Sequence, residues 1–264
     1  MNERSIRQSF LGKESNNIFS ISPIAIIGLC GGGSHIAQQL AHLGFENLLL
    51  VDFDIVEPPN LNRMIGSTPF DAANRELKTD VIERLVKSIN PNIKVTKISC
   101  RWQESGDLLR NCAAIMGCVD SFWERNELES FCRRFLIPYI DIGMDVHESK
   151  TGFSISGQII TSLPNSLCMK CLGYITDKRL TEEINNYGNV GGKPQVVWPN
   201  GTLASIAVGQ LIRLLTPWNS QINISPMIEY DGNRQVTMDS PKLAIFAKYS
   251  CAHYGNISLG DPFW

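Results

Sequence analysis

The fold of this 264-residue chain is decided by one stretch near its start, Ile24-Ala25-Ile26-Ile27-Gly28-Leu29-Cys30-Gly31-Gly32-Gly33-Ser34. The first four residues are apolar and mostly β-branched, which is typical of a strand buried on both faces of a parallel sheet. Apolar residues recur at helical spacing over 34–43, and Gly44 is a natural helix stop. Because a second apolar run follows over 48–51, the sequence predicts a βαβ unit.

The same alternation of strands and helices continues along the chain. It predicts a helix over 81–89, a strand over 93–98, a strand over 113–119, a helix over 122–134 and a strand over 139–142. Beyond Gly143, turn residues such as Gly152 and Gly157 predict short interrupted strands, and residues 176–200 are predicted to form a long loop. A helix is expected over 203–215, and alternation around 222–228 and 234–238 predicts antiparallel strands. The expected architecture is a doubly wound, mostly parallel, Rossmann-like α/β sheet with a part-antiparallel C-terminal extension.

Composition and charge narrow the class of protein. The 24 basic and 26 acidic residues give a formal net charge of −2, which argues against nucleic acid as a partner. The eight cysteines lie mostly in apolar runs, as expected for a reduced, cytoplasmic protein. The first twenty residues are charged and predict no signal peptide, and without a run of 18 apolar residues the sequence predicts no membrane span.

The glycine-rich turn is a candidate phosphate-binding loop. Residues 28–34 connect a predicted strand to a predicted helix, where small residues let backbone N–H groups approach phosphate oxygens. Asp52 lies 24 positions beyond Gly28, at the end of the second strand, where a carboxylate accepts hydrogen bonds from ribose hydroxyls. Cys30 replaces the middle glycine of the G-x-G-x-x-G pattern, so a tight turn that binds no ligand is the alternative. NAD-dependent hydride transfer is the usual assignment for such a loop.

A polar cluster after the second strand argues instead for a magnesium nucleotide. Asn60 and Arg63 follow the carboxyl end of that strand, where ligands bind in open α/β sheets, and Lys78 opens the next helix. The planar fork of Arg63 suits phosphate oxygens, and Lys78 adds a second positive charge. Asp120 follows the next buried strand, and a carboxylate beside two cations suggests Mg²⁺. The alternatives are solvated surface groups and, for Asp120 or Ser121, a helix N-cap.

Two cysteines in the second half of the chain are candidate metal ligands. Cys168 and Cys171 have the C-x-x-C spacing at which two thiolates bind one tetrahedral zinc. The C-terminal region supplies only one further cysteine, Cys251, with His253 as the fourth candidate. A structural zinc site on these four residues is one interpretation; the alternatives are a metal-free cysteine pair and a redox-active cysteine pair.

Taken together, these motifs resemble the ThiF/MoeB-type adenylyltransferases, which are bacterial relatives of ubiquitin-activating enzymes. The resemblance is carried by an ordered set of motifs through most of the chain: Arg7-Gln8, residues 28–34, 51–54 and 60–63, Lys78, Ile89-Asn90-Pro91, Cys118-Val119-Asp120-Ser121 with Arg125, Gly143, and Cys168-Met169-Lys170-Cys171. It implies an N-terminal arm over 1–22, a nucleotide-binding half over 23–147, and a substrate-binding, zinc-bearing half of the same domain over 148–264.

The resemblance also implies a reaction. The C-terminal carboxylate of a small ubiquitin-like or sulfur-carrier protein would attack the α-phosphate of ATP, giving an acyl-adenylate and pyrophosphate. The implied catalytic residues are Arg63, Lys78, Asp120 and, from the partner in a homodimer, Arg7. The implied nucleotide-binding residues are Gly28, Gly31, Gly32, Gly33, Ser34, Asp52, Asp54 and Asn60, with ATP, Mg²⁺ and Zn²⁺ as cofactors. Residues 176–200 and a groove near Gly201 would cover the tail of the protein substrate.

Several positions depart from the family pattern. Cys30 replaces a glycine, Met64 replaces the usual glutamine after Arg63, and Asn74 stands near an expected glycine before Lys78. No cysteine lies between Cys171 and Cys251, so the sequence predicts no thioester nucleophile in the usual place. The alternatives are the tRNA-modifying branch of the superfamily, a catalytically weak scaffold protein, and, as a distant option, an NAD-linked oxidoreductase.

Overall fold

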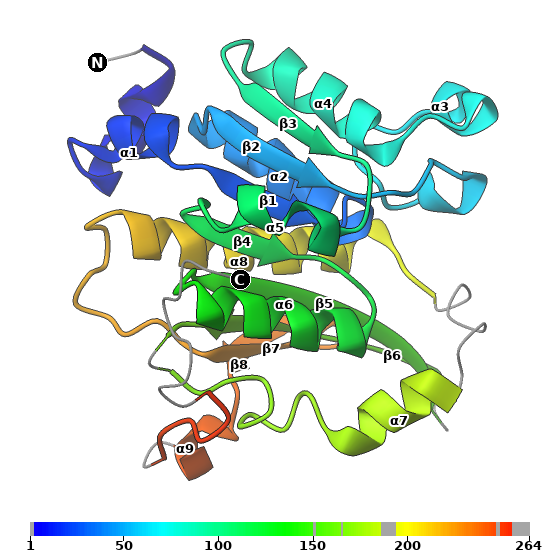
Figure 1. The fold of residues 1–264 in the computed structure, drawn as a ribbon, viewed down its shortest axis with the longest axis vertical. Helices are drawn as coiled ribbons and strands as arrows, with labels where there is room; N and C mark the ends of the chain where they lie inside the picture. The colour runs from blue at the N-terminus through cyan, green and yellow to red at the C-terminus, as the bar shows by residue number, and fades with distance from the viewer. Residues whose placement is uncertain (1–2, 150–151, 165, 186–193, 247–248, 255–264) are drawn as a thin grey trace.

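The computed structural model describes residues 3–149, 152–164, 166–185, 194–246 and 249–254. The described part contains one sheet of eight strands in the order β3-β2-β1-β4-β5-β6-β7-β8 (Figure 1). The strands are β1 (Ile24–Ile27), β2 (Asn47–Val51), β3 (Lys94–Ile98), β4 (Ala114–Gly117), β5 (Tyr139–Ser149), β6 (Gly152–Ser162), β7 (Met227–Asp231) and β8 (Val236–Asp239). The first five strands pair in parallel and the last three join them as antiparallel strands, which confirms the predicted class.

Helices cover both faces of this sheet. The α-helices are α1 (Ser15–Ile21), α2 (Gly31–Leu43), α3 (Pro69–Asn74), α4 (Lys78–Ile89), α5 (Gly106–Leu109), α6 (Phe122–Arg134), α7 (Asp177–Asn185), α8 (Val197–Leu215) and α9 (Leu243–Phe246). Short 3₁₀ helices are η1 (Glu3–Leu11), η2 (Pro58–Asn60) and η3 (Trp102–Ser105). Among the helices of the described ranges, none is long and apolar enough to cross a membrane.

Alternating side chains of the central strands fill two separate cores. In β4, Met116 packs with α2, α4 and α8 on one face, whereas Ile115 packs with α5 and α6 on the other. Both residues are fully buried, as is every residue of β1 to within 3% exposure. This two-sided burial explains why these strands are continuous apolar runs in the sequence and do not alternate.

The predicted strand over 139–142 is confirmed and is longer than expected: it is the start of β5, an eleven-residue strand that pairs along its length with β6. Three other predictions about the second half of the chain are wrong. Gly157 lies inside β6 and not in a turn, and glycine is needed there because a Cβ would come within 2.7 Å of Leu203 on α8. The predicted loop over 176–200 contains α7, and the strand expected from residue 222 begins at Met227.

Candidate active site

The glycine loop joins β1 to α2 at the carboxyl edge of the parallel strands. Gly28 has a φ of +87°, and a Cβ there would lie 2.6 Å from the carbonyl oxygen of Cys118. A Cβ on Gly33 would overlap the carbonyl oxygen of Gly28 itself. Both positions therefore require glycine, and the loop forms a closed backbone turn between the strand and the helix.

The first N–H groups of α2 are available to an anionic ligand. The helix begins at Gly31, three residues before the predicted start, and the side chain of the N-cap residue Cys30 makes no capping hydrogen bond. The first N–H groups of any α-helix lack intrahelical acceptors, so they favour a phosphate placed at the helix end. Asn200 of α8 lies against this turn, with its Nδ2 atom 2.6 Å from the position that a Cβ on Gly31 would take. Sequence reasoning did not identify Asn200.

Asp52, Asp54 and Lys78 form a charged cluster beside the loop. The carboxylate of Asp52 accepts hydrogen bonds from the N–H groups of Leu29 at 2.8 Å and of Asp54 at 2.9 Å. The Nζ atom of Lys78 lies 2.6 Å from Asp54 Oδ2 and 3.9 Å from Asp52 Oδ1. Burial raises the pKa of Asp52, although the charge of Lys78 opposes this shift. Burial alone would lower the pKa of Lys78, but its attraction to Asp52 and its hydrogen bond to Asp54 together raise it.

The segment that carries Asn60 and Arg63 is tied to the glycine loop. Asn60 is buried in η2, and its side-chain oxygen accepts a hydrogen bond from the N–H group of Glu57 at 2.9 Å. Ser34 Oγ donates to the carbonyl of Gly31 and accepts from the N–H group of Ile65, at 3.0 Å each. The hydroxyl of Ser34 therefore fixes the distance between the start of α2 and this segment.

Within the described ranges, the guanidinium of Arg63 makes only local contacts. Its Nη1 atom donates to the carbonyl of Pro59 at 2.5 Å and to the side chain of Asn62 at 3.1 Å. Its Nε atom is buried and has no hydrogen-bond partner among the described residues. The Nη2 group of this half-buried side chain likewise makes no hydrogen bond among the described residues, which leaves Arg63 able to bind an anion at the same edge. Met64, by contrast, is buried in the core that contains α2 and α4.

Asp120 lies at the end of the next parallel strand and is exposed. The N-cap of α6 is Ser121, whose Oγ accepts a hydrogen bond from the N–H group of Glu124 at 3.2 Å. The helix N-cap, which was the alternative role for Asp120, is therefore Ser121. The carboxylate of Asp120 stays exposed at the edge where the phosphate loop lies.

A buried network supports the backbone just before Asp120. Arg125 of α6 donates from Nε to the carbonyl of Val119 at 3.0 Å and pairs with Asp141 at 3.1 Å. Its Nη1 atom also donates to the hydroxyl of Tyr174, which receives a second hydrogen bond from Gln158 at 2.6 Å. Burial raises the pKa of Asp141 to about 6, against the opposing charge of Arg125. The sequence motifs include Arg125, but they did not identify Asp141, Gln158 or Tyr174.

Arg7 does not reach the glycine loop of its own chain. It is exposed on η1, and the neighbouring Gln8 donates a hydrogen bond to the carbonyl of Leu43 at 3.0 Å. Leu43 ends α2, a helix of thirteen residues that begins at the loop. Because each residue of an α-helix adds about 1.5 Å, Arg7 lies roughly 20 Å from the loop.

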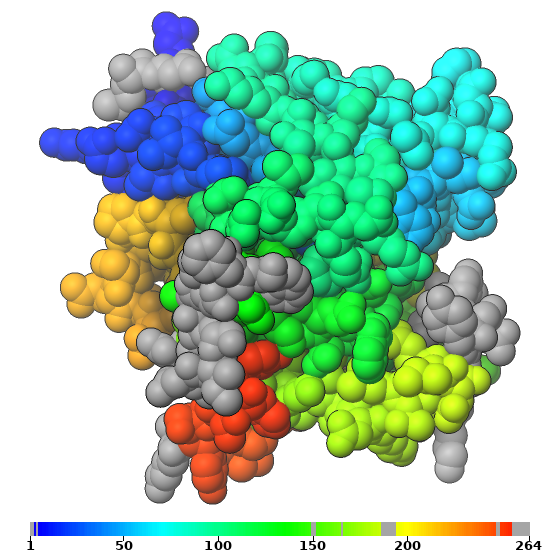
Figure 2. Space-filling view, in the orientation of Figure 1, coloured from blue at the N-terminus to red at the C-terminus, as the bar shows by residue number. Residues whose placement is uncertain are grey.

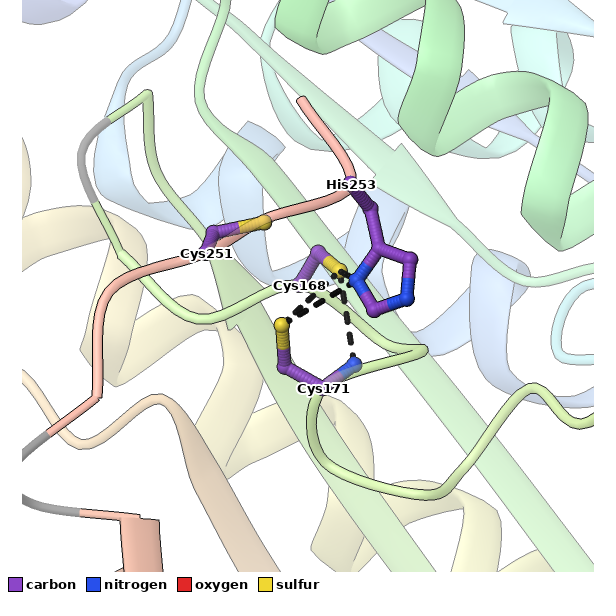
Figure 3. A group of neighbouring side chains, drawn as sticks. All are labelled: Cys168, Cys171, Cys251 and His253. Atoms are coloured by element: carbon purple, nitrogen blue, oxygen red, sulfur yellow. Dashed lines mark hydrogen bonds between the residues drawn. The ribbon is translucent and has the colours of Figure 1, made fainter. Parts of the chain in front are cut away.

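The four predicted metal ligands converge, although they come from segments about 80 residues apart (Figure 3). The sulfur atoms of Cys168 and Cys171 are 3.5 Å apart, and the Nδ1 atom of His253 lies 3.4 Å from the first and 3.3 Å from the second. With Cys251, all four ligand atoms lie within 4.8 Å of one another. Tetrahedral zinc with bonds of about 2.0 to 2.3 Å needs ligand atoms roughly 3.5 to 3.8 Å apart.

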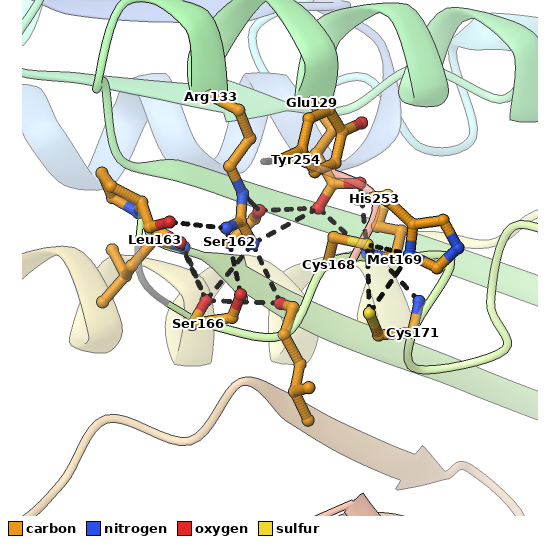
Figure 4. Close-up of polar contacts among 12 residues, drawn as sticks. Glu129, Arg133, Ser162, Leu163, Ser166, Cys168, Met169, Cys171, His253 and Tyr254 are labelled. Atoms are coloured by element: carbon orange, nitrogen blue, oxygen red, sulfur yellow. Dashed lines mark hydrogen bonds and ion pairs between the residues drawn. The ribbon is translucent and has the colours of Figure 1, made fainter. Parts of the chain in front are cut away.

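A buried ion pair on α6 holds the cysteine loop in place (Figure 4). Glu129 is fully buried and accepts hydrogen bonds from the N–H group of Met169 at 3.0 Å and from Ser162 Oγ at 2.6 Å. Burial raises the pKa of Glu129, against the stabilising effect of these hydrogen bonds. Arg133 lies 4.0 Å from the carboxylate of Glu129. Arg133 also donates at 3.0 Å to three loop carbonyls, those of Pro164, Ser166 and Leu167.

The chain is similar in sequence to several characterised enzymes. The chain is 26% identical over 171 residues to the SAMP-activating enzyme E1 of Haloferax volcanii, covering 64% of this chain and 60% of that enzyme. It is 30% identical over 155 residues to the sulfur carrier protein ThiS adenylyltransferase of Escherichia coli, covering 57% of this chain and 58% of that protein. The match thus spans about three fifths of the length of these curated relatives.

The fold has close counterparts among solved structures. The crystal structure of Escherichia coli MccB with ATP aligns with a TM-score of 0.73 over 90% of this chain and 71% of that one. The two sequences are 20% identical, so this likeness concerns the fold. The model of the ThiF family matches residues 3–251, nearly the whole chain. The protein therefore belongs to the ThiF family.

Proposed function

We propose that this protein uses ATP to adenylate the C-terminal carboxylate of a small ubiquitin-like or sulfur-carrier protein. The products are the acyl-adenylate and pyrophosphate. The observation that carries the proposal is the convergence of a glycine-closed helix N-terminus, the Asp52–Lys78 pair and the partly unsatisfied Arg63 at one edge of the sheet. The names of the archaeal and bacterial relatives support the same class of substrate.

Each side chain at this edge has a distinct task in the proposed reaction. The N–H groups at the start of α2 bind phosphate oxygens, and Asp52 binds the ribose. Arg63 and Lys78 stabilise the charge that builds on the triphosphate as the α-phosphate is attacked. Asp120 would hold Mg²⁺, which supplies further neutralisation of phosphate charge when bound. The attacking carboxylate is already ionised at neutral pH, so the reaction needs no general base and depends on alignment and electrostatics.

The proposal includes a homodimer. Arg7 lies at the opposite end of α2 from the loop of its own chain, so its implied catalytic role is met only if it enters the site of a partner subunit. Exposed apolar residues on and beside η1, including Ile6 and Phe10, support a contact surface in this region.

Carrier-dependent exchange of radiolabelled pyrophosphate into ATP tests the proposed reaction. We expect exchange with at least one small ubiquitin-like protein that ends in Gly-Gly, and none when that tail is truncated. Exchange that requires tRNA would favour the tRNA-modifying branch of the superfamily. Failure of the complete set of carriers from the source genome to support exchange would contradict the proposal and favour a scaffold role.

We further propose that Cys168, Cys171, Cys251 and His253 bind one structural zinc ion. The distances between their ligand atoms fit a tetrahedral site, and the three thiols with one imidazole form a donor set that zinc prefers.

Metal analysis of the purified protein tests the zinc site. We expect about one zinc per chain in the wild type, and clear loss of zinc in Cys171→Ser and His253→Ala. Cys100→Ser is the matched control, because Cys100 is a free cysteine outside this cluster. Less than about 0.2 zinc per chain in wild-type protein purified without chelator would contradict the site, since closed structural sites are normally filled.

A further inference from the structure

Helix α7 is bound to the start of α6 by a carboxylate. Glu183 of α7 accepts a hydrogen bond from the N–H group of Phe122 at 3.0 Å through one oxygen and from that of Trp123 at 2.9 Å through the other. These N–H groups belong to the first turn of α6, so they have no acceptor within their own helix. A charged acceptor at a helix N-terminus is favoured both by hydrogen bonding and by the helix dipole.

A second residue of α7 reinforces this contact one helical turn away. Arg179 donates from Nη1 to the carbonyl of Tyr174 at 2.6 Å. Its guanidinium also lies 5.1 Å from the centre of the Phe122 ring, which is a cation–π contact. Helix α7 buries none of its own residues, and it lies on the molecular surface next to α6 (Figure 2). Its position therefore depends on these polar and aromatic contacts together with one half-buried apolar residue, Leu180, which packs against the core cluster that includes Leu128 of α6.

These contacts place α7 beside the candidate active site. Phe122 comes two residues after Asp120, so the start of α6 lies at the edge where the phosphate loop and the proposed magnesium ligand meet. After α7 the chain returns to the same edge on its other side, where the side chain of Asn62 donates to the carbonyl of Gln195 at 2.9 Å. The start of α6 on one side of this edge is thus hydrogen-bonded to Glu183, and Asn62 on the other side is hydrogen-bonded to Gln195. Both Glu183 and Gln195 lie between β6 and α8.

We propose that Glu183 is a positioning residue for the protein substrate, an inference that rests on the proposed function. By binding the start of α6, Glu183 holds α7 as a fixed wall beside Asp120, against which the C-terminal tail of the carrier protein binds. Binding costs conformational entropy in both the carrier tail and the enzyme. If α7 is already ordered before the tail binds, the enzyme's share of this cost is smaller. Glu183 therefore sets the KM for the carrier protein and leaves the KM for ATP unchanged.

Steady-state kinetics of Glu183→Ala, with Glu182→Ala as the matched control, tests the proposal. Glu182 is the preceding residue, and its carboxylate lies 3.8 Å from the exposed Lys178 of the same helix. We expect Glu183→Ala to raise the KM for the carrier protein about tenfold, a change of about 1.4 kcal/mol in binding free energy. The KM for ATP and kcat should stay within about twofold of wild type. Glu183→Gln keeps one acceptor oxygen without the charge, so its effect should be smaller.

Hydrogen exchange at the Phe122 and Trp123 amides gives a second readout that needs no substrate. We expect both amides to exchange at least about tenfold faster in Glu183→Ala than in wild type or in Glu182→Ala. Equal exchange rates in wild type and Glu183→Ala would overturn the contact in solution. Faster exchange with an unchanged KM for the carrier would overturn the positioning role. Absence of pyrophosphate exchange with every carrier would contradict the proposed function, and the amide measurement would still report on Glu183.

Discussion

Replacing Arg63 by alanine is expected to reduce carrier-dependent pyrophosphate exchange about a thousandfold without unfolding the protein. The guanidinium binds only the carbonyl of Pro59 and the side chain of Asn62, and its Nε atom is left without a partner among the described residues. Little of the fold therefore depends on Arg63. In the proposed reaction, by contrast, its charge is aimed at the triphosphate in a partly dehydrated site, where electrostatic stabilisation is strong.

The matched control for this experiment is Arg234→Ala. Arg234 is an exposed arginine beside Asp231 in the turn between β7 and β8, and no nucleotide-binding role is assigned to it. Exchange rates at saturating ATP and carrier should be the same in Arg234→Ala and wild type. Thermal unfolding of the three proteins verifies that folding is intact. Unchanged exchange in Arg63→Ala would remove Arg63 from the mechanism.

Replacing Arg133 by alanine is expected to lower the free energy of unfolding by about 3 to 5 kcal/mol. The substitution leaves the carboxylate of Glu129 buried without its cation, 4.0 Å from the lost guanidinium. It also removes the donor to three loop carbonyls and to Ser162 Oγ. Buried polar groups that lose their partners carry the full penalty of their desolvation, so several losses at one place add to a large effect.

Urea unfolding measures this effect, with Arg134→Ala as the control. Arg134 is the next residue on α6 and is less buried than Arg133, so its loss should change the unfolding free energy by less than about 1 kcal/mol. The free energy of unfolding should fall with urea concentration at a similar slope in both variants. Similar slopes would show that the substitutions change stability and not the surface exposed on unfolding. A loss below about 1 kcal/mol in Arg133→Ala would mean that the buried pair contributes little to the fold.

The parallel half of the sheet was predictable because its signals are local. An apolar run such as 24–27 is buried on both faces, and the glycines that follow it admit one tight turn. The antiparallel half was not predictable in the same way. Gly157 suggests a turn in the sequence, yet it lies within a strand, and it is glycine because Leu203, which is 46 residues further along the chain, leaves no room for a side chain. Local patterns carry no information about such a neighbour.

In the candidate site, too, local features were predictable from the sequence and contacts between distant elements were not. Motif spacing identified the glycine loop, the acidic strand end and the cysteine pair, because each lies within a few residues of chain. Asn200, Tyr174 and Glu183 escaped notice, since each reaches the site from a distant element. Helix α7 was assigned to a loop because its sequence is polar and buries no residue. Its contacts with α6 give it an environment that sequence periodicity does not report.

Strand β5 has a consequence for how proteins of this shape adapt to different partners. Ile140 of β5 pairs in parallel with Met116 of β4 and antiparallel with Thr161 of β6. One strand therefore joins the parallel half of the sheet, which carries the phosphate loop, to the antiparallel half, which contains β6, β7 and β8. Two such halves cannot rotate about a hinge without breaking a continuous ladder of backbone hydrogen bonds. Selectivity for a new partner must then arise from the surface elements that border the sheet, while the shared strand keeps the two halves in one fixed alignment.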